Sequence, residues 1–481
     1  MVCENTRPIF TAMPNADTPI QIEACDLVVA GGGIGSLVAA LTAARTGARV
    51  TLLRPRQGVG AGFVSLPHDN NVLLDVGCRR FDFTQDMHAL PLAHYQLGAR
   101  TRPFAGHART FIENVLALAL SPTHPPQLSY GGKLVPDFAT SLDLTSLKHL
   151  VSPGDLARII QETDNLLSSD APSPYTLGLG RWPDLAGTRL EHASLINHGP
   201  TFHARFIEPF AQKLYADGWK DMPADLTAKI WTPLFFPRTV NQGARQVIDR
   251  ARPAVTYFYP AAGHFGAFVS QLVAKVDGAE NIRQISHNRL TSLANEKGQI
   301  VAEQVDGPPL HWSCPFTLGV SVDHYFDLAG IEAPVEKLPI AIVWVEIAQD
   351  DLLSDLDTVM VFDPGTPVYR VSRAGEGARD GHAILALEMT GGPNVCDAFD
   401  APSTLTRLGL LREGASLTRL RAENEVKIIA PSQTNRQNLR AARTALEARG
   451  VSPVLIGTLN DLKADMLNDQ ILQGLTITQA L

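Results

Sequence analysis

Residues 26–53 of this 481-residue chain read DLVVAGGGIGSLVAALTAARTGARVTLL, and they decide the fold. The apolar runs 26–30 and 49–53 are each typical of a buried parallel strand. Between them, residues 37–47 place apolar side chains at helical spacing and end on a glycine, as helices commonly do. A strand, a glycine turn, a helix and a second strand make one βαβ unit. We therefore predict an α/β fold that begins with a doubly wound, Rossmann-like sheet.

The glycine turn between the first strand and the helix has the composition of a phosphate-binding loop. A glycine directly after the strand permits the tight turn, and the glycine two residues later lets the backbone approach a pyrophosphate. The third small residue, here a serine, lets helix and strand pack. Amides at the helix start would face the phosphates along the favourable end of the helix dipole. We predict dinucleotide binding here, with a purely structural turn as the alternative. The residues concerned are Gly31, Gly33, Ile34, Gly35 and Ser36.

The second strand leads into an arginine, Arg54, at the position where dinucleotide sites usually carry an acidic residue that binds the ribose. Arginine can receive the 2′-phosphate of NADP. It can equally stack on adenine or lie in solvent, with the adenosine end held in another way. We include Arg54 among the predicted cofactor-binding residues and leave these interpretations open.

The composition is that of an ordinary globular protein, with 45% hydrophobic and 19% charged residues. The formal net charge of −8 argues against a nucleic-acid partner, which would require a basic face. No window reaches about 18 consecutive apolar residues, so we expect no stable membrane insertion. The polar N-terminus lacks the pattern of a secretory signal, and we therefore expect a cytoplasmic protein.

The cysteines and histidines suggest neither a disulfide framework nor a metal centre. The five cysteines are far apart, odd in number and without a CxxC pair, which fits a reducing compartment. The histidines show no HxH or HExxH spacing, so we predict no metal site. The absence of GxSxG and Walker A motifs argues against serine hydrolases and P-loop NTPases.

The order of the remaining patterns favours two interleaved domains. Mainly helical patterns follow residue 85, including the stretch TFIENVLALAL (110–120), and strand-like alternation fills 339–390. We predict a mixed helical and antiparallel-sheet substrate domain inserted into the dinucleotide domain. The predicted division is a polar leader over 1–21, a Rossmann-like domain over 22–110, 250–330 and 420–481, and a substrate domain over 111–249 and 331–419.

Several segments together resemble the FAD-dependent amine oxidase and protoporphyrinogen oxidase superfamily. The pattern is most similar to its branch of UDP-galactopyranose mutase-like and protoporphyrinogen-oxidase-like proteins. The opening segment 26–53 matches the family's FAD motif, and LLDVGCRRFDF, with Asp75, Gly77 and Phe81, resembles the segment after the loop over the flavin. The resemblance runs in the family's order from residue 26 to 474. It implies FAD as cofactor and an FAD-type Rossmann domain interleaved with the substrate domain. Further matching segments are YGGKLVPDF (130–138), FIEPFAQKLYADGWKDMPADLTA (206–228), YPAAGHFGAFVSQL (259–272), VYRVSR (368–373) and SPVLIGTLNDLKADMLNDQILQG (452–474).

Carried onto this sequence, the resemblance implies further cofactor contacts at Gly62, Gly77, Gly457 and Met466. The chain also departs from the family at three cofactor contacts. Arg54 replaces the ribose acid, the loop GVGAGF lacks the usual Gly-Arg, and a threonine follows Gly457 where the family has arginine.

Three residues are candidates for catalysis. His264 lies in the turn that passes close to the flavin in the family, where it could donate a hydrogen bond or act as a base; a surface or capping histidine is the alternative. Arg370 could bind an anionic substrate in a bidentate way, or form an outward salt bridge. The family analogy points Lys213 towards the interdomain cleft, whereas a solvated helix face is the plainer interpretation.

We therefore expect an FAD-dependent oxidoreductase that acts on a small or medium metabolite, in which the flavin carries the redox chemistry. A flavin-dependent mutase or isomerase of a sugar nucleotide is the alternative within enzymes. A flavoprotein homologue with a degenerate cofactor site, acting as a binding partner or redox-neutral enzyme, is the alternative from another class. We expect a small-molecule substrate as partner and leave a homodimer open.

Overall fold

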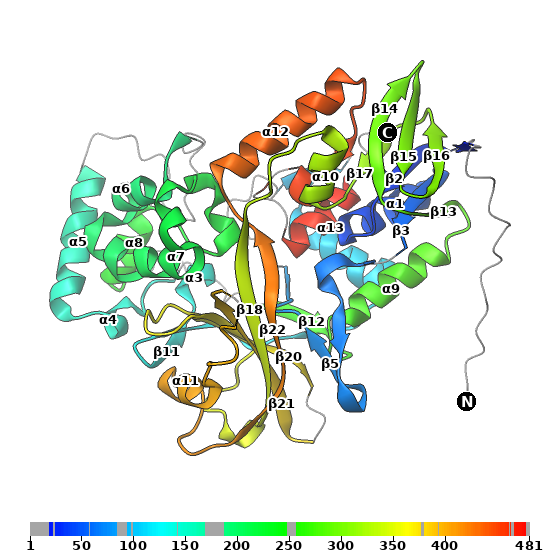
Figure 1. The fold of residues 1–481 in the computed structure, drawn as a ribbon. Helices are drawn as coiled ribbons and strands as arrows, with labels where there is room; N and C mark the ends of the chain where they lie inside the picture. Colours follow the sequence, from blue (N-terminus) through cyan, green and yellow to red (C-terminus); the bar gives the residue numbers. More distant parts are fainter. Residues whose placement is uncertain are drawn as a thin grey trace.

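The structure, a computed structural model, contains a parallel sheet around the glycine turn, a longer mainly antiparallel sheet and a group of helices on the far side of that longer sheet (Figure 1). It describes residues 19–22, 25–56, 58–83, 94–97, 100–141, 143–168, 187–247, 256–376, 380–392, 394–460, 462 and 466–477.

The glycine turn belongs to a five-stranded sheet in which every pair of neighbours is parallel. The sheet has the order β13-β3-β2-β17-β23, and it joins segments from both ends of the chain. The strands are β2 (Leu27–Ala30), β3 (Val50–Pro55), β13 (Ile282–His287), β17 (Phe316–Leu318) and β23 (Val454–Leu455).

Helices cover both faces of this parallel sheet, which explains its nearly continuous apolar strands. Leu27 and Val29 of β2 pack into one core, and Val28 and Ala30 pack into another, as the two-residue period of a strand requires. The first core includes α1 (Ile34–Arg45), α9 (Gly266–Asp277) and α13 (Leu467–Leu475), and the second includes α10 (Val322–Ala329) and α12 (Gln433–Ala448).

A seven-stranded sheet of order β11-β10-β19-β20-β21-β18-β22 forms the second unit. Its pairs are antiparallel except β10 with β19. The strands are β10 (Gln127–Tyr130), β11 (Lys133–Pro136), β18 (Lys337–Ala348), β19 (Thr358–Val361), β20 (Val368–Glu376), β21 (His382–Thr390) and β22 (Leu417–Ile429).

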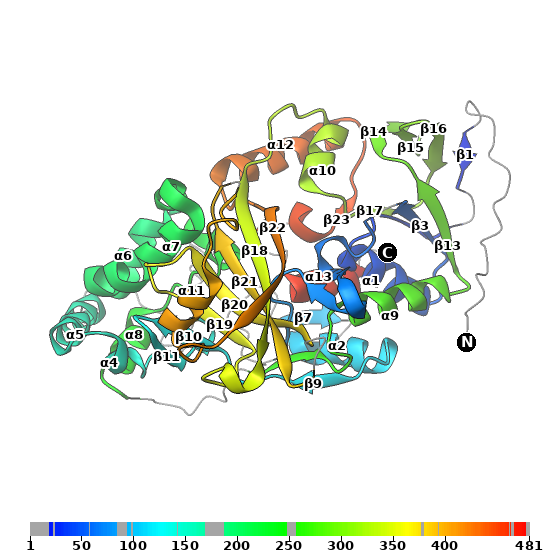
Figure 2. The ribbon, with the colours of Figure 1, turned by 60° about the horizontal axis from the view of Figure 1, so that its bottom comes forward.

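The long sheet lies between a helical group and the unit that contains α1, as Figures 1 and 2 both show. Ile342 and Trp344 of β18 pack into the core shared with the helical group, whereas Val343 and Val345 pack beneath α11 (Ala401–Arg407) on the other face. The helical group consists of α3 (Phe138–Ser141), α4 (Leu147–Leu150), α5 (Pro153–Ser168), α6 (Leu190–Phe202), α7 (Glu208–Tyr215) and α8 (Pro237–Ala244).

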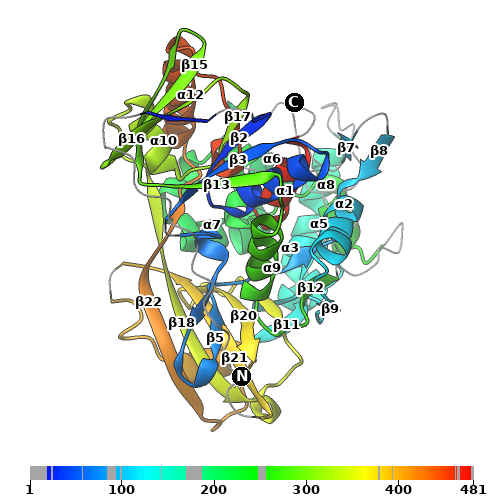
Figure 3. The same ribbon diagram turned by 90° about the vertical axis from the view of Figure 1, so that its right-hand side faces the viewer.

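Smaller sheets complete the arrangement (Figure 3). One has the order β1-β16-β15-β14, one has the order β6-β12-β9, and two are hairpins. Their strands are β1 (Ile20–Gln21), β14 (Leu290–Glu296), β15 (Gln299–Gln304), β16 (Gly307–Trp312), β6 (Phe81–Asp82), β9 (Leu120–Pro122), β12 (Tyr257–Pro260), β4 (Ser65–Pro67) with β5 (Leu73–Asp75), and β7 (His94–Leu97) with β8 (Arg100–Pro103).

Several details differ from the sequence-based expectations. Ile20 and Gln21, at the end of the expected leader, form β1 and pair with β16. The boundary expected at residue 420 falls inside β22, which pairs with β18 of the long sheet. The stretch 110–120 is helical only to Val115, through α2 (Phe104–Thr110) and a π-helical turn (Phe111–Val115), and Leu120 begins β9. No helix in the described part of the chain is both long and apolar enough to cross a bilayer.

Candidate functional site

Gly31 begins the glycine turn in a conformation that excludes a side chain. Its φ is +145°, and a Cβ there would lie 2.4 Å from the carbonyl oxygen of Gly319 and 2.6 Å from Ser36 Oγ. The buried Ser36 hydroxyl would also lie 2.3 Å from a Cβ on Gly319. Ser36 therefore fills the space that two glycines leave open, and the turn tolerates serine in place of the third glycine.

The start of α1 is open on its outer side. A Cβ on Gly33 would meet no atom within 4 Å. Gly33 is the N-cap residue of α1, no side chain caps this end, and the first turn contains no acidic residue. Free amides at a helix N-terminus attract anions through both hydrogen bonds and the helix dipole. This opening fits the pyrophosphate of a dinucleotide.

The C-terminal helix α13 packs against the beginning of α1. A Cβ on Gly35 would lie 2.4 Å from Ile456 Cγ2 and 3.2 Å from the carbonyl oxygen of Gln470, and a Cβ on Gly474 would lie 2.7 Å from Val38 Cβ. Gln470 and Gly474 of α13 therefore both pack closely against the first turn of α1, which leaves no room for side chains at these two glycines.

The two predicted C-terminal contacts, Gly457 and Met466, both adjoin α13. Gly457 has a φ of +72°, which favours glycine, and its N–H donates to Gln473 Oε1 of α13 at 2.5 Å. Met466 is the N-cap residue of α13 and is 41% exposed. Gly457 thus follows Ile456, which packs against the first turn of α1, whereas Met466 lies at the opposite end of α13 from Gln473.

Arg54 is directed elsewhere. Its Nη1 donates to Gln284 Oε1 at 2.9 Å and to Asp277 Oδ1 at 3.1 Å. The guanidinium is thus engaged by the edge strand β13 and by the end of α9. Because arginine has no acceptor, it cannot replace a carboxylate that accepts from ribose hydroxyls. Its binding of a 2′-phosphate stays a prediction.

A loop after β3 connects the glycine turn to Arg79, a residue that the sequence analysis did not single out. The Gly60 N–H donates to the carbonyl oxygen of Gly32 at 2.8 Å, and Arg79 Nη2 donates to that of Gly62 at 3.1 Å. The Arg79 guanidinium also lies 4.7 Å from the centre of the Phe63 ring. Burial lowers the pKa of Arg79. Within the described residues, its hydrogen-bond acceptors are carbonyl oxygens rather than carboxylates.

Asp75 ties this loop to the turn that carries His264. Its buried carboxylate accepts from Ser65 Oγ at 2.6 Å, from the Phe265 N–H at 3.0 Å and from the Tyr259 hydroxyl. Burial, followed by the charge of Asp75, raises the pKa of Tyr259. His264 precedes Phe265, and its Nδ1 is buried without a hydrogen-bond partner in the described structure. An imidazole nitrogen so placed can bind a ligand.

Gly77, a predicted cofactor contact, packs against a buried ion pair. A Cβ on Gly77 would lie 2.6 Å from Glu388 Oε2, and the next N–H, of Cys78, donates to Glu388 Oε1 at 2.9 Å. Arg370 holds the same carboxylate through Nε and Nη2, both at 2.7 Å. Glu388 therefore pairs with the charge of Arg370 and accepts from two of its five N–H donors, and Arg370 is buried rather than outward-facing.

An aromatic stack covers this ion pair. The Arg370 guanidinium lies 4.2 Å from the centre of the Trp231 ring, and Trp231 stacks on Tyr369 at 5.4 Å between ring centres. The Tyr369 hydroxyl donates to Glu388 Oε2 at 3.0 Å. Burial raises the pKa of Tyr369. The stack shields the pair from water and holds it rigidly.

Lys213 lies in a different environment from either sequence-based interpretation. Its Nζ donates to the carbonyl oxygens of Val361, Asp363 and Val368 at 2.8, 2.6 and 3.0 Å. Burial lowers its pKa to about 7. Three acceptors use all three N–H bonds of an ammonium group. Lys213 therefore clamps the turn between β19 and β20, and it has no donor left for a substrate.

The site thus contains residues that the sequence analysis named only as motif matches or did not name. The consecutive arginines directly after Gly77 and Cys78 were the available signal for Arg79 and Arg80. Arg80 lies over the Tyr259 ring at 4.2 Å and donates to the carbonyl oxygen of Arg373 at 2.6 Å. Trp231 had no local signal, because it reaches the site from the helical group. Among the described residues, no group of three or more His, Cys, Asp or Glu side chains could hold a metal ion.

No protein-family model and no curated protein sequence matches the chain. Solved structures do match. The reduced form of UDP-galactopyranose mutase has a TM-score of 0.67 at 14% identity, with 94% of each chain covered. A protein provisionally described as a protoporphyrinogen oxidase, from Exiguobacterium sp. 255-15, has a TM-score of 0.59 at 15% identity, with 94% of this chain and 98% of that chain covered. Putrescine oxidase bound to putrescine has a TM-score of 0.53 at 13% identity, with 96% and 99% covered.

These likenesses confirm the predicted fold class. The chain shares the fold of these solved structures, with a Rossmann-type parallel sheet beside a second, mainly antiparallel sheet. Because identity to each of the three is 15% or less, the likeness concerns the fold.

Proposed function

We propose that this protein is an FAD-dependent oxidoreductase that acts on a small or medium metabolite. The observation that carries the proposal is the open turn at Gly33, where no side chain caps the start of α1 and against which the C-terminal segment packs through Ile456 and α13. An uncapped helix start favours a ligand with a negatively charged group, such as the pyrophosphate of a dinucleotide. FAD has this chemistry, and the shared fold supports the choice.

Different segments of the chain would bind different parts of the cofactor. The turn formed by residues 31–36 would bind the pyrophosphate through backbone amides, and the start of α13 near Met466 would face the other end of the cofactor. Gly62 and Gly77 position the loop and the segment between these two places. When bound, FAD supplies the hydride or electron transfer itself.

Arg79 has the clearest electrostatic role in this proposal. Its positive charge is partly buried and is not neutralised by a hydrogen-bonded carboxylate within the described structure. A preorganised cation in such a place stabilises negative charge that develops nearby. Arg370 has the opposite character, because Glu388 already neutralises it. We therefore assign charge stabilisation to Arg79 and a positioning role to the pair of Arg370 and Glu388.

His264 is the side chain best placed for proton transfer in the turn at residues 260–265. Its unpartnered Nδ1 is one residue away from the N–H that Asp75 anchors. Asp75 thereby fixes the backbone on which His264 stands. A histidine fixed in this way can act as a general acid or base. Lys213 has no part in this chemistry, since backbone carbonyls occupy its donors.

A redox-neutral reaction on a sugar nucleotide is the second candidate. Of the three structures described above, UDP-galactopyranose mutase has the highest TM-score. Such a reaction would also use the positive charge of Arg79 for an anionic substrate. The threonine after Gly457, in place of arginine, weakens the case by removing one cation from the same place.

Anaerobic and aerobic turnover separate the two candidates. The FAD-loaded protein is mixed with panels of amines, hydroxy compounds and nucleotide sugars, and reduction of oxygen or of a dye is followed. An oxidoreductase consumes the acceptor in proportion to the substrate. Conversion of a nucleotide sugar by reduced protein, without net consumption of an acceptor, would favour the mutase. If the loaded protein transforms no member of the panels and does not reduce any acceptor, the proposal loses its support.

A further inference from the structure

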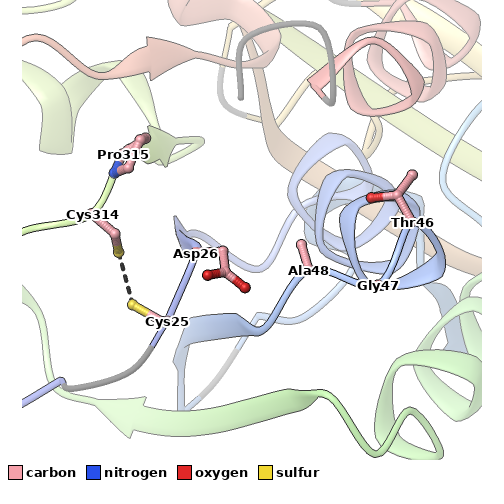
Figure 4. A pocket seen from close by; sticks show the side chains of 7 residues that line it. All are labelled: Cys25, Asp26, Thr46, Gly47, Ala48, Cys314 and Pro315. Carbon is pink, nitrogen blue, oxygen red and sulfur yellow. Dashed lines mark hydrogen bonds between the residues drawn. The ribbon is translucent and has the colours of Figure 1, made fainter.

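Two cysteines that are 289 positions apart in sequence meet at the end of the parallel sheet opposite the glycine turn. Cys25 precedes β2 and Cys314 precedes β17, and these strands are parallel neighbours with Val28 opposite Phe316. Their Sγ atoms lie 2.7 Å apart (Figure 4). A disulfide has a length of about 2.05 Å, so the sulfurs need only a small further approach to bond.

The pair opens to solvent. Both cysteines are partly exposed, and they line a hollow of about 690 Å³ together with Asp26, Pro315 and residues 46–48 at the end of α1. In Figure 4 the two thiols point towards each other at the rim of this hollow. A small oxidant can therefore reach the sulfurs without unfolding of the sheet.

We propose that Cys25 and Cys314 are a redox-active thiol pair. They form a reversible disulfide with each other by thiol–disulfide exchange with a small-molecule disulfide such as oxidised glutathione. The proposal does not depend on the cofactor or on the reaction proposed above. It rests on the position of the two thiols at the ends of adjacent strands and on their access from the hollow.

The chemistry balances as two successive thiol–disulfide exchanges. The Cys25 thiolate attacks one sulfur of the oxidised glutathione, the glutathione S–S bond breaks, and one reduced glutathione leaves. The Cys314 thiolate then attacks Sγ of Cys25, and the second glutathione leaves. The two cysteines lose two protons and two electrons, and the glutathione disulfide gains both.

Cys25 is the better attacking group of the two. The hydrogen bond from Cys314 lowers the pKa of Cys25 to about 7, and the same interaction raises the pKa of Cys314. Attack by a thiol is fastest when its pKa is near the ambient pH. The geometry therefore places two thiols within reach of each other, and the pKa directions favour Cys25 as the nucleophile and Cys314 as the resolving thiol.

The other described cysteines provide matched controls. Cys78 Sγ lies 3.6 Å from Thr358 Oγ1 and has no thiol partner in the described structure. Cys396 is buried in an apolar core, and its Sγ donates to the backbone carbonyl oxygens of Ile342 and Glu423 at 4.0 and 3.8 Å. Neither residue can form the same disulfide.

The test uses the full-length protein, incubated with oxidised glutathione, quenched with an alkylating reagent and digested without reductant. We expect mass spectrometry to find one peptide pair that links Cys25 to Cys314 and disappears after reduction. The variant Cys314→Ser should instead accumulate glutathione on Cys25, and Cys396→Ser should still form the link. Recovery of both cysteines in alkylated form, or links that join either of them to a different cysteine, would overturn the proposal.

Discussion

Arg370 and Glu388 face each other on the neighbouring strands β20 and β21, and their two nitrogen–oxygen contacts are both 2.7 Å. Their side chains are only 7% and 5% exposed. Glu388 also accepts from Tyr369 and from the Cys78 backbone. The pair therefore links the long sheet to the segment that continues to Arg79, and it fixes the position of one wall of the candidate site.

Replacing Glu388 by glutamine should destabilise the fold strongly. The change leaves the buried guanidinium of Arg370 without a counter-charge, and breaking a buried pair in this way costs about 3–5 kcal/mol. Chemical denaturation measures the loss. The control is Glu447→Gln, which removes one partner of an exposed i,i+4 pair on α12 and should change stability little. Equal effects of the two variants would show that the buried pair does not organise this wall.

The stability of the protein should fall with decreasing pH because of His198. Nε2 of this buried histidine accepts from the Phe235 N–H at 2.8 Å, so this nitrogen carries no proton. Burial lowers the pKa of His198 to about 3, below the ordinary value of about 6.5. Between these values the unfolded chain binds one more proton, so this residue contributes a loss of about 1.4 kcal/mol per pH unit as pH decreases.

Denaturation between about pH 4.5 and 6.5 tests this contribution. In the variant His198→Gln, the slope of unfolding free energy against pH should be smaller by the contribution of one proton, about 1.4 kcal/mol per pH unit. His192→Gln, on the exposed face of the same helix, is the control and should keep the slope of the original protein. An unchanged slope in His198→Gln would contradict the assignment.

Substitution by alanine should have different effects on stability at two glycines of the same turn. Gly31→Ala introduces a Cβ 2.4 Å from a backbone oxygen at a φ of +145°, and should cost roughly 2–4 kcal/mol of stability. Gly33→Ala meets no atom of the protein and should leave stability nearly unchanged. If the pyrophosphate lies against Gly33, the same alanine should weaken FAD binding by about tenfold or more. Thermal unfolding without cofactor, followed by FAD titration, measures the two effects separately.

Arg79→Met should change the reduction potential of the bound flavin more than the stability of the fold. The loss of a positive charge that no carboxylate binds by a hydrogen bond removes stabilisation of a reduced, more negative flavin. A change of about 1.4–2.8 kcal/mol corresponds to a two-electron potential roughly 30–60 mV more negative. Spectroelectrochemical titration measures this potential. Arg109→Met, at an exposed pair with Glu113, is the control. A potential that does not move would exclude a role for Arg79 near the flavin.

The glycine turn could be predicted from sequence because its information is local. A strand, the residues 31–36 and a helix follow one another without interruption, and each position has a steric or electrostatic reason. The order of the later motifs extended this local signal to a fold, since Ile456 and Gly474 pack against α1 as the C-terminal motif implied.

The rest of the candidate site depends on contacts between distant segments. Arg370 was predicted as a catalytic candidate, but its pairing with Glu388 could be assigned only once the register of β20 and β21 was known. Lys213 was a candidate for the interdomain cleft, but its Nζ donates to three backbone carbonyl oxygens. Trp231 and Cys314 gave no local signal, because their partners lie 138 or more residues away. The apolar stretch 110–120 was predicted to be helical, but Leu120 lies in β9, because short apolar runs do not distinguish helix from strand.

Binding of FAD to the purified protein tests the central claim most directly. The protein is titrated with FAD, and the visible spectrum of the bound flavin and the quenching of tryptophan fluorescence are followed, with Gly33→Ala measured in parallel. We predict one FAD per chain with roughly micromolar or tighter affinity, and at least tenfold weaker binding to the variant. A protein that is purified without flavin and binds none at about 100 times that concentration would contradict the account.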